Sequence, residues 1–542
     1  MNKELQNNPC QNTQAAKAFL EVYGRSPNLI AELNPHLATL TKKIDDYTND
    51  EIEAILLLDA SCQEFLELYL EKYLTTANQI QFGLSQKEKP LVDFFNSMAT
   101  IYSAALCQVA LRSTVKNLIV TLAGKTLHHL TQHLKWFLFD SSTPDNQVWL
   151  CANSTYLLSD KLQLTEEPFI LYENTQATTL QDLFIIINML STLKHGLFSP
   201  KEVDFTHRIL KKYSNRIHIA NEPIEHVICY YVTIDQNQPA QVYQNIPVNQ
   251  QQRFWSIQPL EATMNPWRVS VLVDIEPKEL KELSISLSNT YFLDKLFTVW
   301  QKSHIIASRA KRESRNDIVE CVSGFQHILN DLQSKAPKKQ KTTLDKSLSL
   351  ATLDDDGRKF NEIDAIQAKE HPVIPQFTGR MLNLSSSGVG MTFEISSQDT
   401  LNIDTLISWQ TITKNGDKNK SELATIIRLQ KHDNDHFIAG MARLAQNPVF
   451  SQIMPLDSPD LHNPWHKGAK VILCKNFDEQ TPHYCIVSTQ KPVFDKSIWA
   501  IQLNNRIFSF QPNRLIRQGI GWYFTQIDIL EEVAKKQKIT PY

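Results

Sequence analysis

The fold of the C-terminal part is decided by the stretch NLSSSGVGMTFE, which occupies residues 383–394. Its polar centre, residues 385–388, separates segments 377–384 and 389–394, in which aromatic and β-branched residues recur with a period of two. A strand, a polar turn and a second strand are the structure that this pattern predicts.

The two-residue period continues beyond this turn. Further strands are predicted at 405–413, 423–430 and 436–444, and the last two flank the polar turn 431–435 as a hairpin would. After Pro455 a second β-rich block follows, with strands predicted at 469–475, 483–489, 497–503, 506–511 and 521–529. Short strands at even spacing favour a barrel or a sandwich.

The N-terminal part has a different pattern. Between residues 49 and 76 apolar side chains recur every three or four positions, and segments 91–122 and 127–139 repeat this. That period is typical of helices with one buried stripe. Ser199, Pro200 and Glu202 have the spacing of a helix start with a capping box, for a helix that runs to about residue 213.

Two stretches join these parts. Segments 226–234 and 267–275 are β-branched and aromatic, which predicts strands, and a helix is predicted over 278–306. Residues 331–372 hold lysine and aspartate runs and one aromatic residue, Phe360, so we expect a disordered insertion there.

Composition excludes several classes of protein. The formal net charge is −3, so no overall field holds a nucleic acid polymer or an acidic membrane. No run of about 18 apolar residues predicts a membrane span, and the polar residues 1–11 predict no signal peptide. The 8 cysteines are scattered without a CxxC pair, which favours reduced thiols. We therefore expect a cytoplasmic protein.

Motifs for catalysis and metal binding are missing. No Walker A loop, third Rossmann glycine or G-x-S-x-G nucleophile turn occurs. His129 and His133 have the spacing of zinc ligands on a helix, but no acid follows at zincin spacing, so half-buried helix histidines are favoured. We expect no enzyme, no catalytic residue, no metal and no cofactor.

Two short polar pieces remain. The first is the basic segment that contains Arg309, Lys311, Arg312 and Arg315. The second is the turn at 383–388, with Asn383, Ser385 and Gly388. Taken alone, the first is a solvated basic helix end, and the second is a β-turn in which Gly388 supplies a positive φ.

Together the two pieces resemble the PilZ domain family. The turn has the form N-x-S-x-x-G of the family motif D/N-x-S-x-x-G, and Lys311 and Arg315 fall on the two arginine positions of its R-x-x-x-R motif. The resemblance covers about residues 309–450 and implies a small Greek-key barrel that binds cyclic di-GMP. It implies ligand binding by Arg309, Lys311, Arg312, Arg315, Asn383, Ser385 and Gly388.

The residue types suit a ligand with two phosphates and two guanines. Arg315 offers a planar fork to a phosphate or a guanine edge, and Asn383 and Ser385 offer an amide and a hydroxyl. Gly388 lets the backbone approach closely. The sequence departs from the family pattern at Lys311, which keeps the charge but not the fork, and in the 68 positions between Arg315 and Asn383 (383 − 315).

The sequence therefore predicts a multidomain α+β protein. Its parts are an all-helical domain at 1–220, a small α/β segment at 221–308, a PilZ-like Greek-key β-barrel at 309–450 with the insertion 331–372, and a second β-rich block at 451–542, which could be a degenerate barrel.

Three functional hypotheses follow. The first is a cyclic di-GMP receptor whose helical half signals to an unknown protein partner, in motility or surface attachment. The second is a scaffold in an assembly such as motility or pilus machinery, which keeps the barrel without the ligand, as Lys311 suggests. The third is an enzyme that uses His128, His129 and His133.

Overall fold

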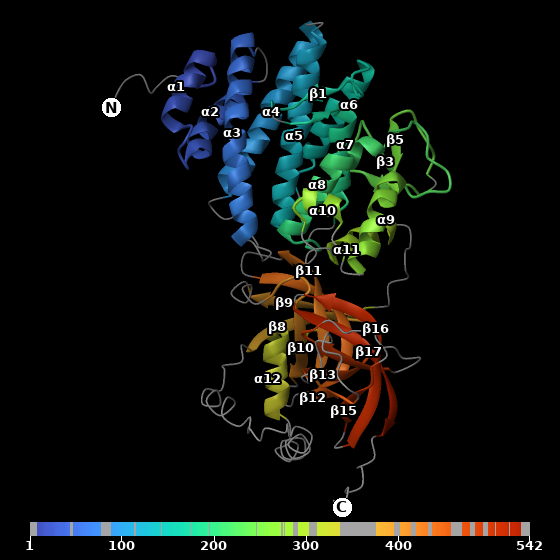
Figure 1. Cartoon of the computed structure of the whole chain (residues 1–542). Coiled ribbons are helices and arrows are strands. Elements are labelled where there is room, and N and C mark those ends of the chain that lie inside the picture. The colour runs from blue at the N-terminus through green and yellow to red at the C-terminus, as the bar shows by residue number, and fades with distance from the viewer. Residues whose placement is uncertain are drawn as a thin grey trace, which may run out of the picture. The chain divides into compact units, whose positions relative to one another are not determined.

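A computed structural model covers the whole chain, drawn in Figure 1. It describes residues 8–43, 47–76, 88–112, 115–142, 144–173, 175–193, 196–244, 246–272, 275, 277–285, 291–302, 312–335, 376–394, 401–412, 419–431, 436–456, 469–476, 483–490, 497–503, 506–519 and 521–532. The chain divides into two compact units, Met1–Ser308 and Arg309–Tyr542.

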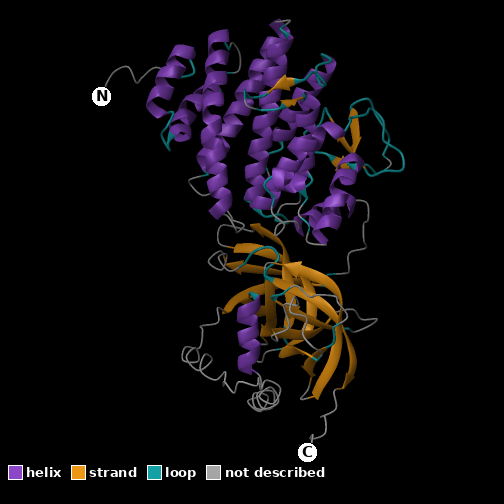
Figure 2. Cartoon of the chain, viewed as in Figure 1, coloured by secondary structure: helices purple, strands orange, loops and turns teal. Residues whose placement is uncertain are grey.

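The first unit is built mainly of helices, coloured purple in Figure 2. Its described elements are α1 (Thr13–Tyr23), α2 (Leu29–Leu40), α3 (Asn49–Thr76), α4 (Lys89–Arg112), α5 (Lys116–Phe139), α6 (Gln147–Lys161), β1 (Phe169–Ile170), β2 (Ala177–Thr178), α7 (Leu180–Ser191), α8 (Pro200–Tyr213), the 3-10 helix η2 (Ser214–Arg216), β3 (Cys229–Thr233), β4 (Gln241–Val242), β5 (Gln252–Ser256), α9 (Gln258–Leu272), α10 (Lys278–Glu282) and α11 (Tyr291–Lys302).

The helix signals in the sequence are confirmed in detail. Helix α8 starts at the predicted capping box, in which the Glu202 amide donates to Ser199 Oγ at 3.4 Å and the Ser199 amide donates to Glu202 at 2.7 Å. Thr48 caps α3, with its amide bonded to Glu51 at 2.8 Å. The segment predicted over 91–122 is two helices, because the chain leaves α4 after Arg112 and starts α5 at Lys116.

Helix α4 has the length and apolarity of a membrane span, and among the described residues it is the only such helix. Half of its apolar window is buried, and its apolar residues, such as Phe94 and Met98, lie in the core of the first unit.

Two predictions for the joining region are wrong. Residues 267–275 are not a strand, since α9 continues to Leu272, and Leu260, Met264 and Trp267 lie in the core at helical spacing. The helix predicted over 278–306 is two helices, α10 and α11, with 286–290 and 303–311 outside the described residues. The strand predicted at 226–234 is present as β3, in the antiparallel sheet β4–β3–β5.

The second unit is a β structure with one described helix. Its elements are β6 (Glu313–Ser314), β7 (Ile318–Ser323), α12 (Phe325–Lys335), β8 (Gln376–Leu384), β9 (Gly388–Glu394), β10 (Leu406–Ile412), β11 (Glu422–Lys431), β12 (His436–Pro455), β13 (Ala469–Asn476), β14 (Tyr484–Ser488), β15 (Trp499–Leu503), β16 (Arg506–Gly519) and β17 (Trp522–Glu532). The insertion predicted over 331–372 begins too early, because residues 331–335 complete α12, whose Leu332 is buried in an apolar cluster; residues 336–375 lie outside the described residues.

The strands close into two antiparallel barrels. The first ring runs β7–β8–β9–β12–β11–β10 and returns to β7. The second runs β12–β13–β14–β17–β16–β15 and returns to β12. Strand β12 therefore belongs to both rings and passes through position 450, where the sequence suggests a boundary. The hairpin predicted at 423–444 is confirmed as β11–β12.

Each barrel has its own interior. In the first, Met391, Phe393 and Phe437 are buried on alternate positions of β9 and β12. The second is filled by Trp499, Phe510 and the other members of one apolar cluster. A hydrogen bond of 2.9 Å from Trp522 Nε1 to the Asp404 carbonyl links the strands of the second barrel to the segment before β10.

Candidate functional site

The described end of the basic segment lies beside the serine-rich turn. Residues Glu313 and Ser314 form β6, which pairs antiparallel with β8 so that Glu313 faces Leu384 and Ser314 faces Asn383. The Arg315 amide continues this pairing with a hydrogen bond of 2.9 Å to the Leu382 carbonyl. Two stretches 68 positions apart (383 − 315) are thus neighbours. Arg309 and Lys311 lie outside the described residues.

Arginines gather at this edge of the first barrel. Arg312 is exposed, and Arg315 forms an ion pair of 2.7 Å with Glu313, with 44% and 65% of their side chains exposed. Arg380 of β8 is exposed too and donates to Asn316 Oδ1 at 3.3 Å. Pairs this exposed are weak, so the guanidinium groups can exchange these partners for an anionic ligand at small cost.

The turn at 385–388 is held by Ser385. Its amide donates to the Gly388 carbonyl at 2.8 Å, and its Oγ accepts the Gly388 amide proton at 3.1 Å. The Ser385 hydroxyl also donates a hydrogen bond of 3.1 Å to the Gly388 carbonyl. Ser385 is therefore a turn-closing residue in this structure, and a ligand that takes its hydroxyl proton has to compete with that bond.

Gly388 is required for a different reason from the one that the turn pattern suggests. Its φ is not positive, since among the described glycines only Gly196, Gly324 and Gly521 have a positive φ. A Cβ at position 388 would instead lie 3.1 Å from the Met441 carbonyl of β12. The glycine lets the start of β9 approach β12 closely.

Asn383 lies above a strip without side chains. It faces Gly390 across β8–β9, and Gly390 faces Gly440 across β9–β12. A Cβ at position 390 would lie 3.0 Å from both Oδ1 and Nδ2 of Asn383, so the amide leans over Gly390. It has no hydrogen-bond partner among the described residues. A partly exposed amide without a partner among the described residues is a ready contact for the edge of a base.

Arg428 stands at the other end of the strip. It faces Gly440 across β11–β12, and a Cβ at position 440 would lie 3.5 Å from its own Cβ. Its exposed guanidinium is bonded to Gln430 on the same strand. Along the barrel wall three strand spacings separate Asn383 on β8 from Arg428 on β11, so the two residues lie on opposite sides of the six-stranded ring. The sequence prediction missed both Arg428 and Gly440.

Arg443 holds the turn at 385–388 in place. It donates to both carboxylate oxygens of Glu422, at 2.9 and 2.8 Å, and to the Ser385 carbonyl at 2.9 Å. Its backbone amide donates to the Ser387 carbonyl at 3.1 Å. Only 10% of the Arg443 side chain is exposed. A largely buried bidentate pair thus orients the N-x-S-x-x-G turn, although nothing in the motif itself points to Arg443.

The first unit holds a separate buried network centred on Asp59. Its carboxylate lies 3.0 Å from Lys125 Nζ and 3.1 Å from His129 Nε2, and it accepts the Tyr102 and Tyr172 hydroxyls at 3.1 Å each. Burial raises the pKa of Asp59, but His129 and Lys125 outweigh burial and hold it well below its usual range.

A second buried pair lies further along α5. Lys135 Nζ is 2.6 Å from Asp204 Oδ1 and 3.5 Å from His207 Nδ1 of α8. Burial lowers the pKa of His207 and of His128 well below the usual range, and the neighbouring cations Lys135 and Lys211 lower that of His207 further.

These contacts decide what the three histidines of the enzyme hypothesis do. His129 Nε2 is 3.1 Å from Asp59 Oδ1, His133 Nδ1 is 3.3 Å from the Val92 carbonyl, and His128 packs edge-on to Tyr172. Among the described residues no group of three or more His, Cys, Asp or Glu side chains is placed to hold a metal ion. All three histidines thus make contacts within the packing of the helical unit.

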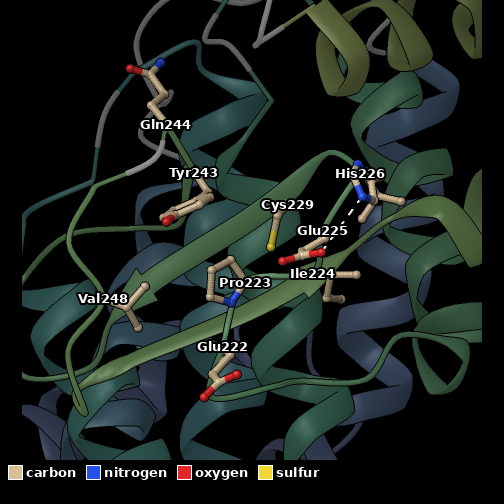
Figure 3. A pocket seen from close by; sticks show the side chains of 10 residues that line it. Glu222, Pro223, Ile224, Glu225, His226, Cys229, Tyr243, Gln244 and Val248 are labelled. Carbon is tan, nitrogen blue, oxygen red and sulfur yellow. Dashed lines mark ion pairs between the residues drawn. The ribbon is translucent and has the colours of Figure 1, made fainter.

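A hollow of about 890 Å³ lies beside the small sheet of the first unit (Figure 3). Its rim carries Glu222, Glu225 and His226, and the side chains of the last two are 89% and 95% exposed and 3.9 Å apart. Among the described residues, neither a lysine nor an arginine lines it. With two carboxylates, the hollow has the wrong charge for a phosphate ligand.

Comparison with protein families finds a match for part of the first unit. Residues 27–223 match the family model described as cyclic-di-GMP receptor FimW, N-terminal domain. The matched segment lies in the helical unit, contains the Asp59 network and does not reach the barrels. No curated protein and no solved structure matches.

Proposed function

We propose that this protein is a cyclic di-GMP receptor that binds the dinucleotide on its first barrel, between the basic segment at 309–315 and the turn at 383–388. Two independent observations support the proposal. The helical unit matches the N-terminal domain of a cyclic-di-GMP receptor, and the motifs of the barrel resemble those of the PilZ family. These observations come from different parts of the chain.

The observation that carries the proposal is the pairing of β6 with β8. It holds Arg315 next to Asn383 and the serine turn, as the clamp over a ligand requires. Arg315 would bind one phosphate or guanine edge through its fork, and Asn383 would bind a base edge through its free amide.

The rest of the molecule would transmit binding. Because the basic segment directly follows the first unit in the chain, closing it on ligand would act on the connection to the helices. The helical half would bind a protein partner, in motility or surface attachment, and the protein would act in the cytoplasm without catalysing a reaction. Ligand shifts such a system only as far as it favours one arrangement.

Calorimetry tests this function with a matched pair of variants. Arg315→Ala removes an exposed arginine that is paired with Glu313 in the proposed site, and Arg506→Ala removes one that is paired with Glu532 at 3.2 Å on the second barrel. We expect at least a tenfold loss of cyclic di-GMP affinity in the first variant, or about 1.4 kcal/mol, and no change in the second. Absence of binding heat in the wild type at high micromolar ligand would reject the proposal.

The second candidate is the scaffold without ligand, favoured by Lys311 at the first arginine position. Lysine offers a point charge where the family pattern has a planar fork. A Lys311→Arg variant separates the two functions: binding that appears only in this variant identifies an eroded site and a scaffold role.

A further inference from the structure

The two barrels have the same topology. When the six strands of the first ring are numbered by their order in the chain, they follow one another around the ring as first, second, third, sixth, fifth and fourth. The six strands of the second ring follow one another in the same order. Strand β13 therefore corresponds to β8, β14 to β9, β17 to the first half of β12, and β16 to β11. Such agreement in connection and direction indicates a duplicated unit fused through β12.

This correspondence maps the glycine strip onto the second barrel. In the first barrel the strip lies one residue pair inside the end of the hairpin β8–β9, whose last pair is Leu384 with Val389. In the second, the last pair of β13–β14 is Lys475 with Tyr484, and the next pair is Cys474 with Cys485. Cys485 of β14 pairs in turn with Gln526 of β17, and Gln526 pairs with Arg514 of β16. The corresponding row of the second barrel is therefore Cys474, Cys485, Gln526 and Arg514.

The row of the first barrel and that of the second differ at their two central positions and have an arginine at the same end. Cysteine and glutamine side chains replace Gly390 and Gly440, whereas Arg514 stands at the position of Arg428. Arg514 Nε donates to Gln526 Oε1 at 2.9 Å, so its guanidinium is bonded to the side chain that fills the strip. The second barrel therefore has the Gln526 side chain at the position that Gly440 leaves open in the first.

The corresponding face is also covered. Cys474 and Cys485 are 3% and 0% exposed and belong to one apolar cluster with Ile328 and Leu329 of α12. Helix α12 follows β7 after Gly324, whose φ of 82° lets the chain turn from strand to helix. Helix α12 thus packs against β13 of the second barrel, at the apolar cluster to which Cys474 and Cys485 belong.

We infer that the second barrel is a copy of the first in which docking of α12 has replaced ligand binding. The chain then has one dinucleotide site, and β6, β7 and α12 form a continuous connection from that site to the second barrel. A further difference agrees with this: the element that precedes the first strand of the second barrel is the other half of β12, so no free basic segment can close over it.

Thiol labelling of the full chain tests the docking of α12 without any ligand. Treatment of the native protein with N-ethylmaleimide, followed by peptide mass mapping, should modify the exposed Cys107 and leave Cys474 and Cys485 unmodified. Leu329→Ala removes a buried contact of α12 and should raise labelling of both by at least about tenfold, while Cys321, inside the first barrel, stays protected. Gln326→Ala, on the exposed face of α12, is the control.

Labelling of Cys474 and Cys485 at the rate of Cys107 in the wild type would overturn the inference. If Leu329→Ala also exposes Cys321, the whole unit has unfolded, and the wild-type rates alone decide the question.

Ligand titration tests the single site and rests on the proposed function. We expect Arg315→Ala to lower cyclic di-GMP affinity by at least about tenfold and Arg514→Ala to leave it unchanged. A residual half of the wild-type stoichiometry in Arg315→Ala, removed by adding Arg514→Ala, would show a second site and contradict the inference. A wild type that binds no ligand rejects the proposed function, but leaves the labelling result on α12 intact.

Discussion

Ser314 lies directly opposite Asn383 in the antiparallel pairing of β6 with β8. One strand pair thereby joins the basic segment to the serine turn, although α12 and a long stretch of chain separate them in sequence. The first barrel positions Arg315 beside the turn through the backbone hydrogen bonds between residues 313–315 and β8.

The glycine strip should be essential for binding but not for folding. In Gly440→Val the new Cβ meets Arg428 Cβ at an ordinary contact distance of 3.5 Å, and valine suits a strand. The added side chain stands where the ligand would lie. We expect at least a tenfold loss of cyclic di-GMP affinity by calorimetry with no fall in the thermal unfolding midpoint. Unchanged affinity would place the ligand elsewhere.

Arg443 should support the turn through its pair with Glu422. Arg443→Ala leaves a largely buried carboxylate and the Ser385 carbonyl without their donor. We expect a loss of about 2–4 kcal/mol in the free energy of unfolding of the second unit, measured by urea denaturation. The double variant Arg443→Met with Glu422→Leu should recover part of this loss, because no buried charge is then left unpaired. Equal stability of single variant and wild type would refute the role.

The buried carboxylate of the first unit should be among its most sensitive positions. Asp59→Asn removes the charge that Lys125 and His129 face, and leaves those groups buried. We expect a destabilisation of about 3–5 kcal/mol. Hydrogen exchange of α3 and α5 peptides should rise, whereas peptides of the barrels should not change. A variant that exchanges like the wild type would show that the network contributes little.

The first unit should lose stability in acid. The pKa values of His128 and His207 are lowered in the folded state, so the unfolded chain binds protons first as pH falls below about 6.5, and folding weakens. The lowered pKa of Asp59 adds a second loss as pH falls below about 4. Hydrogen exchange between pH 7 and pH 5, corrected for intrinsic rates, should show α8 opening in the wild type and less opening in His207→Gln. Equal profiles would exclude His207 as the cause.

Local signals in the sequence predicted several elements correctly. The capping box at Ser199 and Glu202 placed the start of α8, and the polar turn at 431–435 predicted the β11–β12 hairpin. Both depend on residues that are close in the chain, for which spacing determines geometry. The strand predicted at 267–275 failed because tryptophan and valine suit a strand, whereas packing of Met264 and Trp267 in the core favours a helix.

Features that depend on residues far apart in the chain could not be predicted from the sequence. The pairs of Asp59 with Lys125 and Tyr172 join positions 66 (125 − 59) and 113 apart, and neither end has a distinctive neighbourhood. Gly390 and Gly440 become a strip only when β9 and β12 pair in this register. Arg443 and Arg428 looked like ordinary strand residues, and only the barrel brings them to the turn and to the strip.

The central claim is that cyclic di-GMP is enclosed between the basic segment and the serine turn. Hydrogen–deuterium exchange of the full chain with and without saturating cyclic di-GMP tests it most directly. Peptides that contain residues 312–318 and 383–390 should both become protected, because the ligand would hold β6 against β8 and cover the turn. Protection confined to other peptides, with these two unchanged under saturation, would contradict the account.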